Sequence, residues 1–278
     1  MKYYKAKIDP AGNTYSCDMV RLKCDFGDNS KGLVEYLVHK SAYDLDYEIK
    51  YFKSYSNFTY RHLWTIYSPY EDNVSFTVGL DLGNQQQNIG FVEFNPNKVE
   101  LRHKAKSILH TVLNFAIIKE LKRYDLAIDI MCKRSEAHII RQGKRRYTKI
   151  LENDGLTEYL GVHNTEGFVK LYDKTKESDL QDEILTRLEI TLLKHTDASR
   201  VFPVVTLGDD DISLCLTGLT ETDRVLIDLL RNNEDKGYYL QRLGYVKRKK
   251  IEPYLLSITL SLDKNCSYHV KQLALAYE

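Results

Sequence analysis

The side chains best suited to chemistry in this sequence lie at alternate positions of three short segments. Alternate positions face the same side of a β-strand, and the residues between them here are mostly apolar and face a core. The residues on the polar sides are Asp125 and Asp129 of YDLAIDI, Arg187 and Glu189 of RLEITLL, and Lys170, Tyr172 and Lys174 of FVKLYDK. If the three strands pair, three carboxylates, a tyrosine and three cations crowd one surface of a sheet.

Carboxylates gathered on one surface repel one another unless a positive charge lies among them. A hard divalent cation bound by oxygen ligands is one source of that charge, and a carboxylate-rich site without cysteine favours Mg²⁺ or Mn²⁺ over Zn²⁺. The alternative is a solvated sheet face on which the carboxylates form ion pairs across the strands. The residue pattern alone leaves both interpretations open.

Two basic clusters have the composition of nucleic-acid contacts. Lys144, Arg145 and Arg146 suit a mobile loop that touches DNA, although a solvated run of charge has the same composition. In the second cluster, cations lie near tyrosines that can stack on bases. It comprises Lys247, Arg248, Lys249 and Lys250, close in sequence to Tyr238, Tyr239 and Tyr245. The net charge of the whole chain is +1, so nucleic-acid binding is limited to local patches of this kind.

Hydrophobic periodicity predicts the elements that position these residues. Alternation predicts strands over residues 16–26, 60–67, 74–82, 89–94, 124–130, 158–162, 168–174 and 187–193. Apolar residues at helical spacing predict helices over residues 31–40 and 102–122. A mainly antiparallel central sheet with helices inserted between its strands is an α+β fold.

The sequence changes character near residue 200, which predicts a boundary between two parts. Residues 208–211, a glycine and an acidic triplet, form a polar junction. Beyond it, Thr220 and Asp223 form a capping box at the start of a predicted helix. We therefore predict a main domain over residues 1–200 and a small helical C-terminal subdomain over residues 201–278.

The order of the motifs resembles the trans-acting Rep family, the rolling-circle replication initiators of small plasmids. In that family a hairpin of the form YxGxxxxxxxxxxYDKxxE leads to an RxE strand, and here YLGVHNTEGFVKLYDKTKE leads to RLEITLL. KRYDLAID, further upstream, is similar to the R-x-D-x-A-x-D strand of the family. The sequence contains no HxH pair, which fits this branch of the HUH-like enzymes, because acidic residues bind the metal in it.

The resemblance implies a nicking-closing enzyme, a site-specific DNA endonuclease and strand transferase. Tyr172 is then the nucleophile that forms a 5′-phosphotyrosine link, and Lys170 and Lys174 flank it on the same strand face. The residues that would bind Mg²⁺ or Mn²⁺ are Asp125, Asp129 and Glu189. Arg187 belongs to the same catalytic set as Tyr172, Lys170 and Lys174, and it could hold phosphate at two points together with Arg123. The residues that would bind DNA are Arg123, Lys144, Arg145, Arg146, Lys247, Arg248, Lys249 and Lys250.

The resemblance also implies partners and a location. The partners are plasmid double-strand origin DNA with a hairpin or single-stranded nick site, a second copy of the chain in a homodimer, and a host helicase. Residues 1–200 would hold the nicking domain, and residues 201–278 would recognise DNA and dimerise. The N-terminus lacks the apolar stretch of a signal peptide, and the apolar run 112–118 is too short for a bilayer. We therefore expect a protein of the bacterial cytoplasm without a membrane partner.

Three other functions stay compatible with the sequence. A conjugative relaxase of the same family uses the same chemistry, a DNA-binding regulator keeps the scaffold without cleavage, and a metal-only nuclease uses the carboxylates with water. Tyr124, between Arg123 and Asp125, is a second tyrosine beside the predicted site and thus an alternative nucleophile.

Overall fold

The chain folds into two compact units, each assembled from segments that are distant in the sequence. The computed structural model describes residues 3–43, 48–53, 60–68, 74–82, 88–140, 145–152, 155–178, 184–208, 219–231, 235–256 and 258–278. Unit 1 comprises Met1–Ile128, Glu189–Ala198 and Asp263–Glu278, and unit 2 comprises Asp129–Leu188 and Ser199–Leu262. Two long strands, β7 (Ile118–Ile130) and β12 (Thr186–Leu193), contribute residues to both units.

Unit 1 is built on an antiparallel sheet. Besides its parts of β7 and β12, its strands are β1 (Lys7–Ile8), β2 (Thr14–Asp25), β3 (Glu48–Lys53), β4 (Tyr60–Ser68), β5 (Val74–Leu82) and β6 (Ile89–Phe94). Their order is β3-β4-β5-β6-β2-β7-β12, with β1 paired to β2 at the side. The predicted α+β class with a mainly antiparallel sheet is confirmed.

Strand β2 shows how alternation in the sequence gives this sheet an apolar and a polar face. Val20, Leu22 and Cys24 are fully buried, whereas Arg21 between them is half-buried. Arg21 lies opposite Glu93 of β6 in the strand register. The polar face of unit 1 therefore carries charged residues from neighbouring strands, as the alternation predicts.

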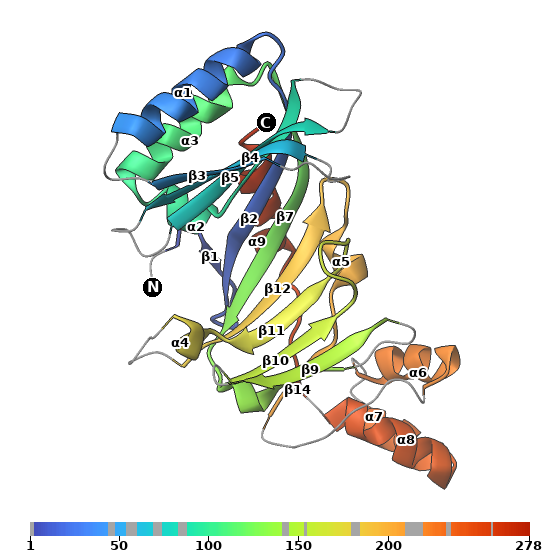
Figure 1. The fold of residues 1–278 in the computed structure, drawn as a ribbon. Helices are drawn as coiled ribbons and strands as arrows, with labels where there is room; N and C mark the ends of the chain where they lie inside the picture. The colour runs from blue at the N-terminus through green and yellow to red at the C-terminus, as the bar shows by residue number, and fades with distance from the viewer. Residues whose placement is uncertain are drawn as a thin grey trace. The chain divides into compact units, whose positions relative to one another are not determined.

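Helices cover the sheet of unit 1. They are α1 (Asn29–Tyr43), α2 (Pro96–Val99), α3 (His103–Phe115) and α9 (Lys264–Leu275). Helices α1 and α3 lie side by side, and α1 also contacts β3 (Figure 1). The buried side of α3 consists of Ala105, Ile108, Leu109, Val112 and Leu113. Helix α9 packs against β2.

The compact units differ from the predicted division at residue 200, because Asp129–Leu188 belong to unit 2 and helix α9 belongs to unit 1. Asp263 caps the helix by accepting a hydrogen bond from the N–H of Cys266 at 2.7 Å. At the end of the chain, buried Tyr277 donates to Glu100 at 2.9 Å. The functional assignment of residues 1–200 and 201–278 stays a prediction.

Unit 2 contains two small sheets. Besides its parts of β7 and β12, its strands are β8 (Ala137–Ile139), β9 (Tyr147–Glu152), β10 (Gly155–Leu160), β11 (Val169–Asp173), β13 (Val205–Leu207) and β14 (Ile258–Thr259). One sheet has the order β12-β11-β10-β9 and the other the order β14-β13-β8. Strands β10 and β11 form an antiparallel hairpin in which Tyr159 lies opposite Lys170.

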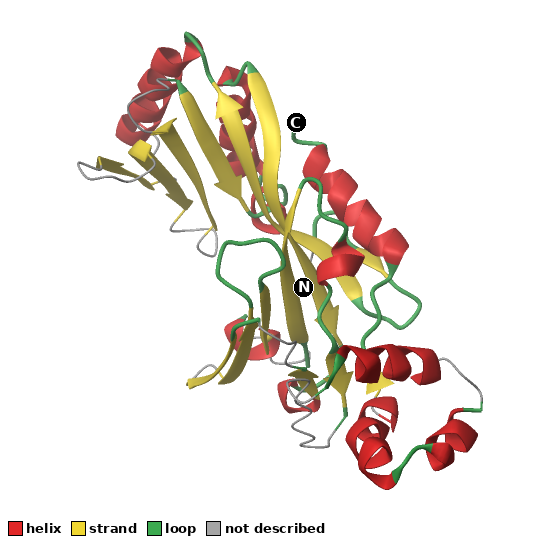
Figure 2. Ribbon diagram, turned by 90° about the vertical axis from the view of Figure 1, so that its right-hand side faces the viewer, coloured by secondary structure: helices red, strands yellow, loops and turns green. Residues whose placement is uncertain are grey.

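Three helices of unit 2 form a group of their own, as Figure 2 shows. They are α6 (Glu221–Arg231), α7 (Lys236–Arg242) and α8 (Tyr245–Leu256). Unit 2 also contains the short helical turns Arg134–Glu136 and α4 (Lys174–Glu177), and α5 (Ala198–Val201) begins at the last residue of a unit 1 segment. Helices α6, α7 and α8 share a hydrophobic core with two residues from outside the helices. It comprises Ile140, Leu219, Ile227, Leu230, Leu240 and Ile251. The predicted capping box is confirmed, because Thr220 and Asp223 exchange backbone-to-side-chain hydrogen bonds of 2.8 and 3.2 Å. None of the helices in the described ranges is long and apolar enough to cross a membrane.

The predicted helix over residues 102–122 is wrong in its last part. Helix α3 ends at Phe115, and β7 begins at Ile118. Ala116 has extended backbone angles, and the N–H of Ile117 donates to the carbonyl of Asp25 at 2.7 Å. Pairing with β2 therefore overrides the helical spacing of the apolar residues at this point.

Candidate functional site

Tyr172 lies on β11 of unit 2, close to two lysines. Its side chain is 4% exposed. The Lys170 ammonium lies over the phenol ring, 3.9 Å from the ring centroid, and the Lys174 ammonium lies 5.8 Å from it. A cation over an aromatic ring is attracted by the negative face of the ring, and this attraction holds both ammonium groups close to Tyr172. The structure thus brings together the three residues predicted for this strand.

Lys174 reaches the ring from a different element than predicted. Strand β11 ends at Asp173, which caps α4 by accepting a hydrogen bond from the N–H of Lys176 at 3.0 Å. Lys174 is the first residue of that helix, and its ammonium also pairs with Glu177. The prediction that Lys174 shares the strand face is therefore wrong, because a side-chain cap ends the strand before it.

Asp129 and Arg187 form a buried ion pair with each other in unit 2. Arg187 Nε donates to Asp129 Oδ1 at 2.5 Å, and Arg187 Nη2 donates to Asp129 Oδ2 at 2.9 Å. The two side chains are 2% and 3% exposed. A two-point pair of this kind satisfies both carboxylate oxygens and fixes the guanidinium in one plane. The predicted metal ligand and the predicted phosphate holder thus neutralise each other here.

Asp125, four residues earlier on β7 and in unit 1, lacks such compensation. Its Oδ1 is shielded from solvent and has no hydrogen-bond partner among the described residues. Burial raises its pKa from the ordinary 3.8 to about 6, although Arg123 and a hydrogen bond with Thr191 pull the pKa down. The negative charge of Asp125 is therefore destabilised by its surroundings, and a bound cation would offset this effect.

Arg123 is held in a cluster of charges on the polar face of unit 1. Its Nη2 lies 2.9 Å from Glu93 Oε2, which also lies 3.3 Å from Arg21 Nη1. Arg123 is 11% exposed. Because Arg123 is mostly buried and paired with Glu93, little of its guanidinium surface is accessible to a DNA phosphate. The DNA-binding role of Arg123 therefore stays a prediction.

The three predicted metal ligands do not form a complete cation site in this structure. Among the described residues, no group of three or more His, Cys, Asp or Glu side chains is placed to hold a metal ion. Asp129 does not fit, since both of its oxygens accept from Arg187. Asp125 fits, since its Oδ1 has no partner in the described part of the chain. Glu189 is half-buried on β12, two residues from Thr191 and on the same strand face.

The first basic cluster directly precedes β9 (Tyr147–Glu152), and Arg145 supports the β10–β11 hairpin. Lys144 lies outside the described residues. The Arg145 guanidinium donates to the carbonyl of Gly167 in the β10–β11 loop, and burial lowers its pKa. Arg146 is exposed, and its carbonyl accepts a hydrogen bond from the N–H of Gly161 at 2.8 Å.

The second basic cluster lies on α8, where two of its lysines bind a buried carboxylate. Lys247 pairs with Asp223 of α6, and Lys250 lies 2.8 Å from the same side chain, which is 1% exposed. These two lysines hold the pKa of Asp223 well below its usual range. Lys249 is exposed and lies 5.9 Å from the Tyr245 ring, and Arg248 pairs weakly with Glu252 at 3.8 Å.

A buried network around Glu158 was missed by the reasoning from sequence. Glu158 is 2% exposed and accepts hydrogen bonds from Arg134 at 2.7 Å, from the N–H of Ile139 at 3.1 Å, and from Tyr147. It thereby ties β10 to β8 and β9. The alternation in GLTEYL gives the available signal, because it places Glu158 on the same side as Leu160, which is fully buried.

Tyr124, the alternative nucleophile, belongs to the core of unit 1. Its side chain is 1% exposed, and burial raises its pKa well above the ordinary value. Successive residues of a strand face opposite sides, so Tyr124 faces away from the polar side that carries Arg123 and Asp125. The geometry therefore favours Tyr172.

Comparisons with known proteins bear on these motifs. A curated protein named "Replication initiation protein", from Staphylococcus aureus, is 26% identical over 204 residues, which cover 66% of this chain. The chain spans 60% of the length of that relative. No model of a protein family matches the chain.

One solved structure, the rolling circle replication initiator protein from Geobacillus stearothermophilus, covers 88% of this chain and 97% of its own, at 15% identity and a TM-score of 0.39. The similarity in sequence confirms the resemblance to replication initiators that the order of the motifs predicts.

Proposed function

We propose that the chain is a plasmid replication initiator of the rolling-circle type, which nicks and rejoins its origin DNA. The similarity to a replication initiation protein and the order of the motifs support this function. The observation that carries it is the position of Tyr172 on the polar side of β11, beneath the ammonium of Lys170 at 3.9 Å. The work of an initiator on plasmid DNA would take place in the bacterial cytoplasm.

The proposed reaction transfers a DNA strand to the protein and back. The Tyr172 oxygen attacks the scissile phosphorus, forms a P–O bond and gives up its proton to solvent. The bond from phosphorus to the 3′-oxygen breaks, and that oxygen takes up a proton and leaves as a 3′-hydroxyl. The phosphotyrosine link preserves a phosphate ester bond, so the reverse attack by the 3′-hydroxyl rejoins the strand without ATP.

Lys170 has two roles in this proposal. Free tyrosine has a pKa of about 10 and is mostly protonated at neutral pH, so a cation beside the phenol favours the reactive phenolate. Its long, flexible side chain also covers the ring of Tyr172, which is 4% exposed. DNA binding must therefore displace the Lys170 ammonium from the ring towards the phosphate, a movement that a lysine stem allows.

We propose DNA contacts for basic side chains that do not pair with a buried carboxylate. In α8, Lys247 and Lys250 bind Asp223, which leaves Lys249 and Arg248 as the better candidates. Tyr245 is 69% exposed beside Lys249 and can stack on a base. A homodimer and a host helicase are further partners that we propose on the resemblance alone.

We propose that nicking requires a divalent metal ion. Mg²⁺ or Mn²⁺ at the scissile phosphate would polarise the P–O bond. Of the predicted ligands, Asp125 fits a cation and Asp129 does not, because Arg187 already neutralises it. Nicking that persists in excess chelator would remove the metal from the proposal and leave the tyrosine chemistry intact.

The experiment that tests the proposal is a search for a covalent adduct. A labelled origin hairpin oligonucleotide is incubated with the protein and Mn²⁺ and run on a denaturing gel. We expect an adduct with the wild-type protein and none with Tyr172→Phe. Tyr268→Phe is the matched control, because Tyr268 is a 64% exposed tyrosine on α9, and it should form the adduct normally.

Each alternative function gives a different result in the same experiment. Cleavage without an adduct indicates a metal-only nuclease, and a mobility shift without cleavage indicates a regulator. An adduct that persists in Tyr172→Phe but is lost in Tyr124→Phe contradicts the choice of nucleophile. A conjugative relaxase gives the same adduct and is distinguished by cleavage at a transfer origin instead of a replication origin.

A further inference from the structure

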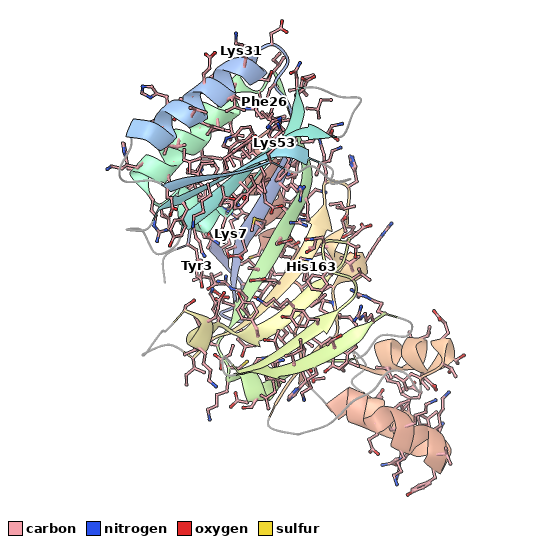
Figure 3. The ribbon with its side chains drawn as sticks, in the orientation of Figure 1. Tyr3, Lys7, Phe26, Lys31, Lys53 and His163 are labelled. Atoms are coloured by element: carbon pink, nitrogen blue, oxygen red, sulfur yellow. The ribbon has the colours of Figure 1, made fainter. Side chains whose placement is uncertain are left out.

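Three aromatic rings lie together beside the hairpin of β10 and β11. The rings of Tyr159 and Phe168 are nearly parallel, at an angle of 18° and a centroid distance of 5.9 Å. His163 meets Phe168 edge-on, at 80° and 5.2 Å. His163 lies in the loop that joins the two strands, as Figure 3 shows. Two nearly parallel rings at this distance form an offset stack, in which each ring covers part of one face of the other.

The strand register places this ring surface next to Tyr172. Tyr159 lies directly opposite Lys170, and the Lys170 ammonium lies 3.9 Å from the centroid of Tyr172. Phe168, Lys170 and Tyr172 occupy alternate positions and therefore share one face of the hairpin. Tyr159 and Phe168 are half-buried, so part of each ring reaches solvent. A line of rings, interrupted by one lysine, thus leads to the proposed nucleophile.

The loop that carries Phe168 is fixed from outside the hairpin. The Arg145 guanidinium donates to the carbonyl of Gly167, the residue just before Phe168. Gly167 has a φ of +74° and Gly161 a φ of +99°, conformations that favour glycine. The N–H of Phe168 donates to the carbonyl of Thr165 at 3.1 Å. The backbone that carries Phe168 is therefore held in place before any ligand binds, which lowers the entropy lost on binding.

We propose that Tyr159 and Phe168 form a stacking surface for an unpaired DNA base that neighbours the scissile phosphate. This inference rests on the proposed function, since it takes Tyr172 as the nucleophile. Stacking on aromatic rings accepts any base, because every base has a π-face. With its base held on these rings, the nucleotide beside the nick lies next to Lys170 and Tyr172, so the surface positions the phosphate for attack.

The test compares ring removal in the protein with base removal in the DNA. Tyr159→Leu and Phe168→Leu are measured for binding of a fluorescent single-stranded oligonucleotide that spans the nick site, and for the KM and kcat of nicking. We expect each variant to weaken binding and raise KM about tenfold, the range of one base–aromatic contact. Tyr159→Phe keeps the ring and should restore most of the affinity. Tyr268→Leu, at a position on α9 that is 64% exposed, is the control for loss of a tyrosine elsewhere.

Oligonucleotides with one abasic position then identify the base. At one position beside the nick, removal of the base should weaken wild-type binding about tenfold and abolish the difference between wild type and Phe168→Leu. If the variants bind every abasic oligonucleotide more weakly than wild type by the same factor, the rings act only on the fold, and the proposal is wrong. Wild-type affinity of both leucine variants also overturns it. A failure of the proposed function gives a different result. In that case the wild-type protein binds the single strand but forms no covalent adduct with it.

Discussion

Asp125 and Asp129 occupy the same face of β7 four residues apart, yet their surroundings are opposite. Asp129, in unit 2, accepts two hydrogen bonds from Arg187 at 2.5 and 2.9 Å. Asp125, in unit 1, has a shielded oxygen without a partner among the described residues, and its pKa is raised to about 6. One carboxylate is compensated by the fold, and the other needs a proton or a cation.

The difference separates a structural carboxylate from a functional candidate. Burial destabilises a charge unless a partner restores what water supplied. Arg187 gives that partner to Asp129, whereas Arg123 near Asp125 is shared with Glu93 at 2.9 Å. We therefore infer that Asp125 is the better cation ligand of the two and that Asp129 fixes the strand pair at Arg187.

The largest expected effect is the loss of the Arg187 side chain. Arg187→Met leaves the Asp129 carboxylate buried without its partner, and we expect the free energy of unfolding to fall by about 3–5 kcal/mol. The double variant Asp129→Leu/Arg187→Met removes both charges and should recover most of that loss, since apolar replacement of a buried pair is often nearly neutral. Urea unfolding at pH 7, followed by far-UV circular dichroism, measures both. If the free energy of unfolding of Arg187→Met lies within about 1 kcal/mol of the wild-type value, the ion pair does not stabilise the fold.

A smaller effect is expected from Asp125 and depends on pH. Its folded-state pKa of about 6 lies above the ordinary 3.8, so the folded protein binds more protons between these values. Stability from this group is therefore complete below about pH 4 and is lost as the pH rises through about 6. The free energy of unfolding of Asp125→Asn, measured with urea, should exceed that of wild type by about 3 kcal/mol at pH 7.5 and should match it near pH 4.

Divalent cations sharpen that prediction. If Asp125 ligates Mn²⁺, the cation should raise the melting temperature of the wild-type protein at pH 7.5, because it binds the folded state. The same addition should leave Asp125→Asn unchanged, while Asp129→Asn keeps the response. A response that disappears only in Asp129→Asn would reverse the assignment of the two aspartates.

The smallest effect is expected at Asp223, a third aspartate that extends the comparison. Lys247 and Lys250 lower its pKa, so its contribution is present at neutral pH and is lost as the pH falls below about 4. Asp223→Asn should lower the free energy of unfolding by about 1 kcal/mol at pH 7.

Lys249→Ala should leave the free energy of unfolding unchanged and weaken DNA binding, and the remaining affinity should depend less on salt concentration. Equal losses of DNA affinity in Lys247→Ala and Lys249→Ala would contradict the division of roles on α8.

Much of the fold could be predicted from the sequence, because local patterns decide it. Alternation in residues 74–82 and 89–94 gives β5 and β6 with their observed bounds. The capping box at Thr220 was predictable for the same reason, since its two partners are three residues apart. The end of α3 was not, because the N–H of Ile117 pairs with Asp25, which lies far away in the sequence.

The site could be predicted only in part, because its decisive contacts are long-range. The motifs place Asp129 and Arg187 on polar strand faces but do not say that they bind each other across 58 residues. Likewise, the run of cations on α8 does not reveal that Asp223, 27 residues before Lys250, holds two of its lysines. Residue types indicate which groups carry charge, and strand and helix packing decide which of them remain available for chemistry.

The most direct measurement of the central claim is mass spectrometry of the covalent adduct. The protein is reacted with an origin oligonucleotide, the DNA is digested with nuclease, and the peptides are analysed. The account predicts a nucleotide phosphate on the peptide that contains Tyr172, and no such modification in Tyr172→Phe. A modified peptide that contains Tyr124 or Tyr245 and not Tyr172, or cleaved DNA without any modified tyrosine, would contradict it.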